Sequence, residues 1–489
     1  MKRSSPAILL LALVCDFAVG TAQEFRWSGN LLTRETWSGP VRGSVSYTYD
    51  NDLEITSRRV NDRAAIAFSY DADKLLTRVG DLIITRNSQN FLITATTIGN
   101  ISDSWSYNEF AELTNYTAVF GSTPLYSVQL TRDALSRIVA GTETIGGAAS
   151  QYAYTYDLAG RLAVVTLNGA TIATYAYDSN GNRLSIAVGN ETRTAAYDAQ
   201  DRLLSHGAGA YTYTANGELA TRTVANQTTS YEYDVLGNLT RVVLSDGTDI
   251  RYLIDGRNRR VGKMVSSALT QGFLYDNNRR LVAELDGAGN VVSEFVYGAL
   301  EHAPDYLFKG GQTYRIICDH LGSPRLVVNT TTGQIVQRVD YDAFGQVLAD
   351  TSPGLHPFGF AGGLYDHDTR LVRFGARDFD AETGRWTAKD PILFAAGKPN
   401  LYAYVGSDPV NFTDASGLQD SSSGPSTQAP IVRKVNELLK EIEKSPVRPG
   451  GPLDPCQNLN DKQAQERGMQ GPTGPGGFKF GFSLTFSLP

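Results

Sequence analysis

The side chains most often used for metal binding and nucleophilic catalysis are sparse in this chain. Its five histidines are His206, His302, His320, His356 and His367. Their separations do not match the ligand spacing of a zinc site, and no serine–histidine pairing stands out. Glycine-rich stretches fall at expected hairpin turns rather than between a strand and a helix, where a phosphate-binding loop would lie. The sequence therefore predicts no metal and no cofactor.

Two cysteines lie beyond the N-terminal segment, Cys318 and Cys456. In an oxidising compartment they could form a disulfide that ties the C-terminal tail to the preceding region. The alternative, which the sequence favours, is two unrelated thiols.

Carboxylates remain as candidate reactive groups, and many of them belong to a repeat. A Tyr-x-Tyr-Asp pattern recurs, and its second tyrosines are separated by 21 residues (Tyr156 to Tyr177) or 20 residues (Tyr177 to Tyr197, and Tyr213 to Tyr233). Weaker copies centre on Tyr49, Tyr70 and Tyr275. A fixed period near 20 residues predicts a repeat architecture.

Each repeat predicts two strands and two turns. Tyr-x-Tyr places both rings on one face of a strand, because strand side chains alternate. Asp157 and Gly160 occupy the end positions of a type I turn, and Asn168-Gly169 is a hairpin signal. The chain is therefore predicted to be all-β, a long antiparallel meander. Because sheets twist and open edges invite pairing, we expect it to spiral into a barrel-like shell.

Composition agrees with this class. The 489 residues include 25 tyrosines and 20 phenylalanines, only 19% are charged, and the net charge is −7. Abundant aromatics fit a half-buried β surface, and the acidic balance argues against nucleic-acid binding.

The first 22 residues resemble a secretory signal peptide. Lys2 and Arg3 precede an apolar stretch, residues 7–19, and small residues follow up to Ala22, after which we expect cleavage. The stretch is short for a membrane span, and no later segment is apolar enough for one. The protein is expected to be exported, as a secreted, periplasmic or cell-surface protein.

The last 71 residues, 419–489, differ in composition. A Ser/Gly/Pro-rich linker (420–430) precedes a predicted short helix (431–445), and residues 478–486 alternate like a strand. The tail has no histidine and nearly balanced charge. A linker with a docking helix is favoured, and a short enzymatic toxin is the alternative.

A series of motifs near the C-terminal end makes a family resemblance specific. They are residues 319–325 (DHLGSPR), 341–345 (YDAFG), 377–385 (RDFDAETGR), 390–392 (DPI), 400–405 (NLYAYV), 408–411 (DPVN) and 414–418 (DASGL). In this order they resemble the core segment of Rhs proteins. With the Tyr-Asp (YD) repeats, residues 45–418 resemble the group of Rhs proteins, toxin-complex C-subunits and teneurins.

The resemblance implies a YD-repeat shell (residues 23–309) and a core segment (310–418) that plugs one end. The variable tail (419–489) is then the cargo, held inside or displayed. The repeat region is short for a closed shell, so the shell could be open-ended or could need a shell-completing partner protein.

The resemblance further implies an aspartyl self-protease formed by Asp390 and Asp414, which cuts after Leu418. Two carboxylates in a desolvated pocket hold one proton between them, so one activates water while the other donates a proton. Arg377 and Arg385 could pair with these carboxylates; the alternative is that either is an ordinary surface charge.

Both motifs depart from the family's Asp-Pro-x-Gly-Leu. Residues 390–394 (DPILF) lack the glycine, and residues 414–418 (DASGL) lack the proline. The alternative is that both aspartates are ordinary turn residues.

Three functions follow as alternatives. The first is a secreted shell that presents or releases its tail. The second is a surface structural or adhesive protein that binds glycans or other cells. The third is a tail effector packaged by the shell.

Overall fold

The computed structural model describes residues 12–13 and 21–422, and all of these belong to the first of two compact units, residues 1–427. The predicted tail helix, the predicted tail strand and Cys456 lie outside the described residues. So does the predicted signal peptide, apart from residues 12–13 and 21–22. The regular secondary structure of the described part is strand apart from three short 3₁₀ turns, and the predicted all-β class is confirmed.

The main sheet has 33 strands. They are β1 (Ala12–Leu13), β2 (Ala22–Ser28), β3 (Leu31–Ser38), β4 (Gly43–Tyr49), β5 (Ile55–Val60), β6 (Ile66–Tyr70), β7 (Leu76–Val79), β8 (Leu82–Arg86), β9 (Ile93–Ile98), β10 (Ile101–Tyr107), β11 (Leu113–Phe120), β12 (Thr123–Arg132), β13 (Ile138–Ile145), β14 (Ala148–Tyr156), β15 (Leu162–Leu167), β16 (Ala170–Tyr177), β17 (Arg183–Val188), β18 (Glu191–Tyr197), β19 (Leu203–His206), β20 (Gly209–Tyr213), β21 (Leu219–Val224), β22 (Gln227–Tyr233), β23 (Leu239–Val243), β24 (Asp249–Ile254), β25 (Arg260–Val265), β26 (Ala268–Tyr275), β27 (Leu281–Asp286), β28 (Val291–Val296), β29 (Tyr306–Lys309), β30 (Gln312–Cys318), β31 (Pro324–Asn329), β32 (Ile335–Tyr341) and β33 (Val347–Asp350). Each strand pairs antiparallel with its neighbours in sequence, which is the predicted meander.

The YD turn forms as its residue types dictate. Asp157 Oδ1 accepts the backbone N–H groups of Ala159 and Arg161, both at 2.9 Å, and Gly160 adopts φ 83°. The second tyrosine links successive repeats, because the Tyr177 hydroxyl donates to the carbonyl of Leu162 at 2.8 Å. The equivalent tyrosines of the neighbouring repeats make the same hydrogen bond. Tyr156, one repeat earlier, donates to the carbonyl of Ile138. The tyrosine thus fixes neighbouring repeats together.

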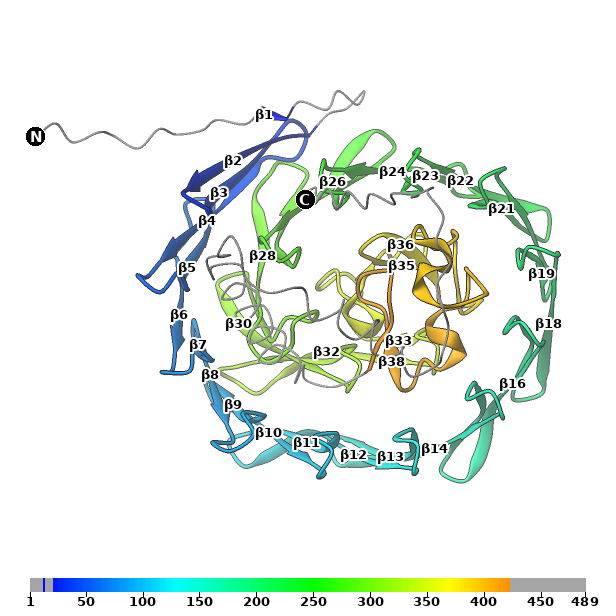
Figure 1. Ribbon diagram of the computed structural model, residues 1–489, viewed down its shortest axis with the longest axis horizontal. Coiled ribbons are helices and arrows are strands. Elements are labelled where there is room, and N and C mark those ends of the chain that lie inside the picture. The colour runs from blue at the N-terminus through cyan, green and yellow to red at the C-terminus, as the bar shows by residue number, and fades with distance from the viewer. Residues whose placement is uncertain (1–11, 14–20, 423–489) are drawn as a thin grey trace, which may run out of the picture. The chain divides into compact units, whose positions relative to one another are not determined.

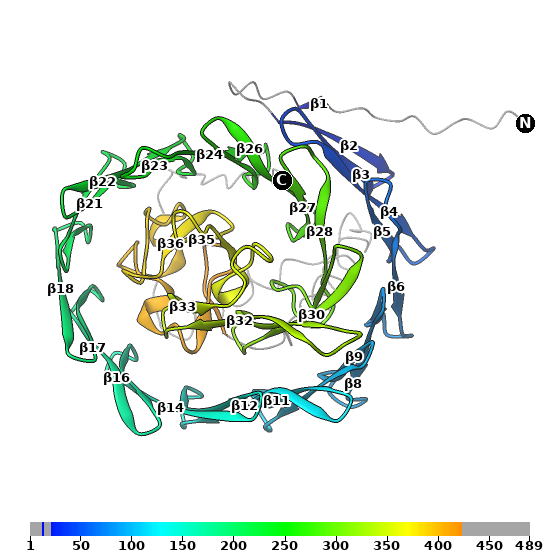
Figure 2. The ribbon, with the colours of Figure 1, turned by 180° about the vertical axis from the view of Figure 1, so that it is seen from behind.

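The meander coils into a spiral that overlaps itself (Figures 1 and 2). The strands from β2 to β24 make one turn, and β26, β28 and β30 then run inside β3–β9. Among the described strands β33 pairs with β32 alone, so the sheet is a spiral rather than a hydrogen-bonded barrel.

The overlap holds the two largest apolar cores. One combines Leu32, Trp37 and Val45 of the outer turn with Phe273 and Phe295 of the inner turn. The other joins outer strands β6–β13 to the inner strands β28–β31. Inner strands are buried on both faces, as expected for the middle layer of a stack.

After β33 the chain enters the space that the spiral surrounds (Figure 1). There it forms β34 (Leu364–Tyr365), β35 (Leu371–Phe374), β36 (Arg377–Asp380) and β37 (Arg385–Trp386), a separate four-stranded sheet, and the short pair β38 (Phe412–Thr413) and β39 (Ser421–Ser422). Three 3₁₀ turns, η1 (Phe360–Gly362), η2 (Leu393–Ala396) and η3 (Val405–Ser407), connect these strands. We call residues 352–420 the plug. The meander itself continues to Asp350, well past residue 309.

Candidate functional site

Three segments of the plug place the predicted dyad. Arg377 begins β36, Asp390 lies in the loop after β37, and Asp414 directly follows β38. Phe374, Phe379, Trp386 and Tyr404 form a buried aromatic cluster beneath them. Rings packed this closely leave the surrounding loops little freedom to move.

Arg377 bridges the two aspartates. Its Nη2 lies 2.9 Å from Asp390 Oδ2 and 3.2 Å from Asp414 Oδ2, and all three side chains are buried. Its Nε donates to the carbonyl of Gly417 at 2.6 Å, and its guanidinium carbon lies 4.1 Å from the centre of the Trp386 ring. The two carboxylates are therefore linked by the guanidinium group of Arg377, which both contact, and not by a shared proton.

Asp414 holds the segment that contains the predicted cut. Its Oδ1 accepts the backbone N–H groups of Leu418 at 3.0 Å and Gln419 at 3.1 Å, and the Ser416 hydroxyl at 2.9 Å. Gln419 N is the nitrogen of the peptide bond after Leu418, so a buried carboxylate contacts the nitrogen that would leave.

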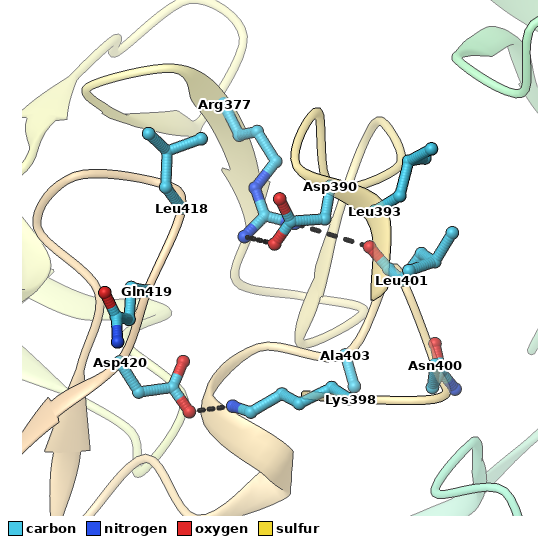
Figure 3. Close-up of a pocket in the computed structure, with 10 residues that line it drawn as sticks. All are labelled: Arg377, Asp390, Leu393, Lys398, Asn400, Leu401, Ala403, Leu418, Gln419 and Asp420. Atoms are coloured by element: carbon cyan, nitrogen blue, oxygen red, sulfur yellow. Dashed lines mark hydrogen bonds and ion pairs between the residues drawn. The ribbon is translucent and has the colours of Figure 1, made fainter. Parts of the chain in front are cut away.

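Asp390 faces a cavity of about 160 Å³ that also borders Leu418 and Gln419 (Figure 3). A cavity of this size has room for water. Burial raises the pKa of Asp390, and Arg377 opposes that shift. A carboxylate with a raised pKa is a stronger base toward water than an ordinary one.

Lys398 belongs to this site although sequence reasoning missed it. It lines the cavity, and its ammonium pairs with the carboxylate of Asp420, two residues beyond the predicted cut (Figure 3). Burial lowers its pKa to about 8, because the charged form is desolvated. A lone lysine between two motifs carries no sequence signal; only its position in space identifies it.

Arg385, the second predicted supporting cation, points away from the dyad. Its Nη1 donates to Asn182 Oδ1 at 2.8 Å and its Nη2 to the carbonyl of Asp201, and it lies 4.7 Å from the Tyr197 ring. It anchors the plug to the shell. The expected pairing of Arg385 with the dyad is therefore corrected. Its side chain points toward the shell, whereas the side chain of Arg377 points toward the loops that carry Asp390 and Asp414.

The glycine position of the two motifs is occupied differently. Leu393 stands where the family has glycine and keeps a left-handed backbone, φ 52°, with its N–H bonded to the Asp390 carbonyl at 2.9 Å. Gly417 in the second motif has φ 68°, and a Cβ there would overlap the Phe374 carbonyl. The turn after Asp390 is thus preserved at the cost of strain in Leu393.

The contacts of His320 and Cys318 are those of structural residues rather than of reactive ones. His320 Nε2 donates to the Val410 carbonyl at 2.9 Å, and Cys318 is buried and free. Within residues 21–422 no group of three or more metal-ligating side chains converges, and no helix there is long and apolar enough to cross a membrane.

Comparison with known proteins gives a family match over most of the chain. Residues 10–410 match the family described as Teneurin YD-shell. Mouse teneurin-4 is 28% identical over 409 residues, which is 79% of this chain and 14% of that relative. Zebrafish teneurin-3 is 29% identical over 413 residues, covering 79% of this chain and 15% of the relative. The chain thus spans a small part of the length of these relatives.

Solved structures of toxin complexes share the fold. A TcdB2-TccC3-TEV crystal structure matches with a TM-score of 0.64 and 16% identity over 81% of this chain and 23% of that one. The Photorhabdus luminescens Tc holotoxin pore matches over the same shares, with a TM-score of 0.66 and 15% identity. At such low identity the likeness concerns the shell fold alone.

Proposed function

This chain belongs to the Teneurin YD-shell family, and from that premise we propose that it is an exported shell that cuts itself once, between Leu418 and Gln419. The cut separates residues 419–489 from the plugged shell. The observation that carries this proposal is the contact of Asp414 with the nitrogen of that peptide bond, beside a second carboxylate on the same arginine.

The proposed reaction is hydrolysis of one peptide bond. Asp390 takes a proton from a water molecule in the cavity, and the hydroxide oxygen adds to the carbonyl carbon of Leu418. The bond from that carbon to Gln419 N then breaks, and the nitrogen gains the proton through the carboxyl group of Asp414. The products are a carboxylic acid at Leu418 and an amine at Gln419, and transfer of the acid proton to the amine gives a carboxylate and an ammonium group, so atoms and charge balance.

Arg377 and Lys398 position the segment rather than exchange protons. Arg377 binds the carbonyl just before Leu418, and Lys398 binds Asp420 just after it. The bond is held on both sides, and such pre-orientation removes much of the entropic barrier to reaction.

The test is intact mass of the purified full chain beside Asp390→Asn and Asp414→Asn variants. We expect the wild type to yield two fragments that meet at Leu418 and Gln419, and both variants to stay whole. Asp157→Asn, which alters a YD turn outside the plug, is the matched control and should cleave. A wild-type chain that remains whole rejects the proposal.

A second candidate is a surface protein that binds neutral polysaccharide, and one observation favours it. The outward face of β10–β22 carries small, uncharged side chains. Its exposed or half-exposed members include Ser102, Ser104, Thr117, Ser127, Thr142, Thr144, Thr155, Thr174, Thr192, Thr194, Thr212, Thr221, Thr223 and Thr228. We call this set the hydroxyl face.

The hydroxyl face is ordered across strands. Ser104 bonds Thr117 at 2.7 Å, Thr212 bonds Thr221 at 2.6 Å, and Thr223 bonds Thr228 at 2.8 Å. The hydroxyl face ends within β22, where the exposed Glu232 of that strand pairs with Arg241 of β23, which also pairs with Asp249 of β24. Rows of hydroxyls about 4.8 Å apart approximate the length of one sugar unit in an extended chain, and no charge needs desolvation there.

Retention of the full chain on insoluble cellulose and starch tests this candidate, with sulfated dextran as the charged comparison. Thr194→Lys and Thr223→Lys should weaken retention on the neutral polymers. Ser69→Lys, an exposed position of β6 outside the hydroxyl face, is the control. Absence of wild-type retention on neutral polymers rejects the candidate.

A further inference from the structure

The residue immediately after the predicted cut is a glutamine with an unusual set of contacts. Gln419 N lies 3.1 Å from Asp414 Oδ1 and 3.3 Å from Ser416 Oγ, and its exposed side chain borders the cavity (Figure 3). Cleavage would make this nitrogen a free α-amine while it still touches a carboxylate.

We propose, on the premise of the self-cleavage described above, that the site also closes Gln419 into a ring. The new α-amine attacks the Cδ amide carbon of its own side chain. A five-membered lactam forms, the bond from Cδ to the side-chain nitrogen breaks, and ammonia leaves. The product is an N-terminal 5-oxoproline, and the step needs neither oxidant nor co-reactant.

Asp414 supplies the base for this step. An α-amine is a nucleophile only when it is deprotonated, and an adjacent carboxylate accepts the proton that the amine releases. The same Asp414 oxygen that contacts the peptide N–H before cleavage is thus positioned to serve the amine after it.

Lys398 keeps the new end in place long enough to react. Its pairing with Asp420 lies on the far side of Gln419 from the cut, so it survives cleavage. The amine, the carboxylate and the side-chain amide then remain together, which raises their effective concentration.

Ring closure has a consequence for the reaction as a whole. The amine that could rejoin the Leu418 carboxylate is consumed, so the cut becomes irreversible. The released tail also begins without a positive charge.

The test is the mass of the tail fragment cut from the wild-type full chain, compared with a synthetic peptide of residues 419–430 in the same buffer. We expect the fragment to be lighter by one ammonia than a chain with a free glutamine, and to close at least tenfold faster than the peptide. A fragment that keeps its amine, or closes no faster than the peptide, overturns the inference and leaves self-cleavage intact. An uncut chain rejects both.

Two variants sharpen this result, with the fraction closed counted only among cut fragments. Gln419→Asn shortens the side chain by one methylene, so a five-membered ring cannot form and the fragment should keep its amine. Lys398→Gln should lower the closed fraction toward that of the free peptide. An unchanged fraction in Lys398→Gln would show that the pairing with Asp420 has no part in the step.

Discussion

In two arcs of the same shell, the inward face of the strands is covered by different parts of the chain. In the double arc, β3–β13, the inner turn of the spiral covers the inward face of the strands. In the single arc, β14–β23, the plug and the turn before β33 do so: Leu371 and Val410 of the plug and Phe344 of that turn enter the apolar clusters of the arc. The repeat is the same in both arcs, so the covering layer decides how each one is stabilised.

Buried ion pairs fasten the double arc. Arg315 of the inner turn lies 2.7 Å from Asp103 of the outer turn and 3.0 Å from Asp305, and all three side chains are at most 3% exposed. Arg325 similarly pairs with Glu143 at 2.8 Å. Such pairs favour one register of the overlap, because any other would leave a buried charge without a partner.

The single arc receives the plug through its turns. Two YD turns of this arc carry arginine four residues after the aspartate, Arg161 after Asp157 and Arg202 after Asp198, and each arginine pairs with the aspartate of its own turn. Two turns carry asparagine instead. There Asn182 Oδ1 accepts Arg385 at 2.8 Å, and Asn238 Oδ1 accepts Arg373 at 2.6 Å. Because asparagine is shorter than arginine, it leaves space beside the turn that an arginine of the plug occupies. We call this space a socket.

The largest effect is expected from breaking the double arc. Arg315→Met should cost about 3–5 kcal/mol of unfolding free energy, because it leaves two carboxylates buried without their partner. Denaturant unfolding measures this. Arg251→Met removes an exposed pair with Asp249 and should cost under about 1 kcal/mol. Equal losses for the two variants would contradict the role of the buried network.

Breaking a socket of the single arc should cost less and act locally. Arg385→Gln should lose about 1.5–3 kcal/mol, the usual worth of charged hydrogen bonds. Limited proteolysis should then cut the plug before the shell. Arg161→Gln, in a turn that closes itself, is the control, and a similar release of its plug would refute the distinction.

A turn covered by the plug should also respond to pH. Burial raises the pKa of Asp342 to about 6, whereas hydrogen bonding from Arg137 lowers the pKa of the half-buried Asp133. A folded pKa above the unfolded value means that the contribution to stability is full below about pH 4 and is lost as pH rises through about 6. Asp342→Asn should therefore gain up to about 3 kcal/mol relative to wild type at pH 7.5.

At pH 4 that gain should vanish, because the wild-type carboxyl is then protonated. Asparagine can accept the same two backbone N–H groups, from Phe344 and Gln346. Thermal unfolding at both pH values tests this, and a gain that does not depend on pH would exclude titration of Asp342 as its cause.

The smallest effect is expected at the strained turn of the plug. Leu393→Gly should stabilise the protein by about 1 kcal/mol, because glycine adopts φ 52° without the clash that a Cβ causes. The apolar side chain is half exposed, so little burial is lost. Gly417→Leu is the reverse test and should destabilise strongly. A loss of stability in Leu393→Gly would show that the leucine side chain matters more than its backbone strain.

Sequence alone located the strands, the meander and the family, and the comparisons confirm the last two. It also singled out Asp390, Asp414 and Arg377, which the fold gathers at one point. It misplaced Arg385 and overlooked Lys398. Both errors concern the direction in which a side chain points from a loop or a short strand, and no periodicity reports that direction.

The sequence by itself determined the local structure, because turn chemistry and alternation act over a few residues. Asp157 and Gly160 fold their turn from neighbouring atoms alone. Only the tertiary structure decided which strands overlap, which turns receive the plug and which lysine meets Asp420. Those contacts join residues that are far apart in the sequence, as Gln23 and Asp255 are joined across 232 positions and Ile138 and Asn411 across 273. They depend on how far the spiral advances per repeat, a property of the whole sheet that no single repeat encodes.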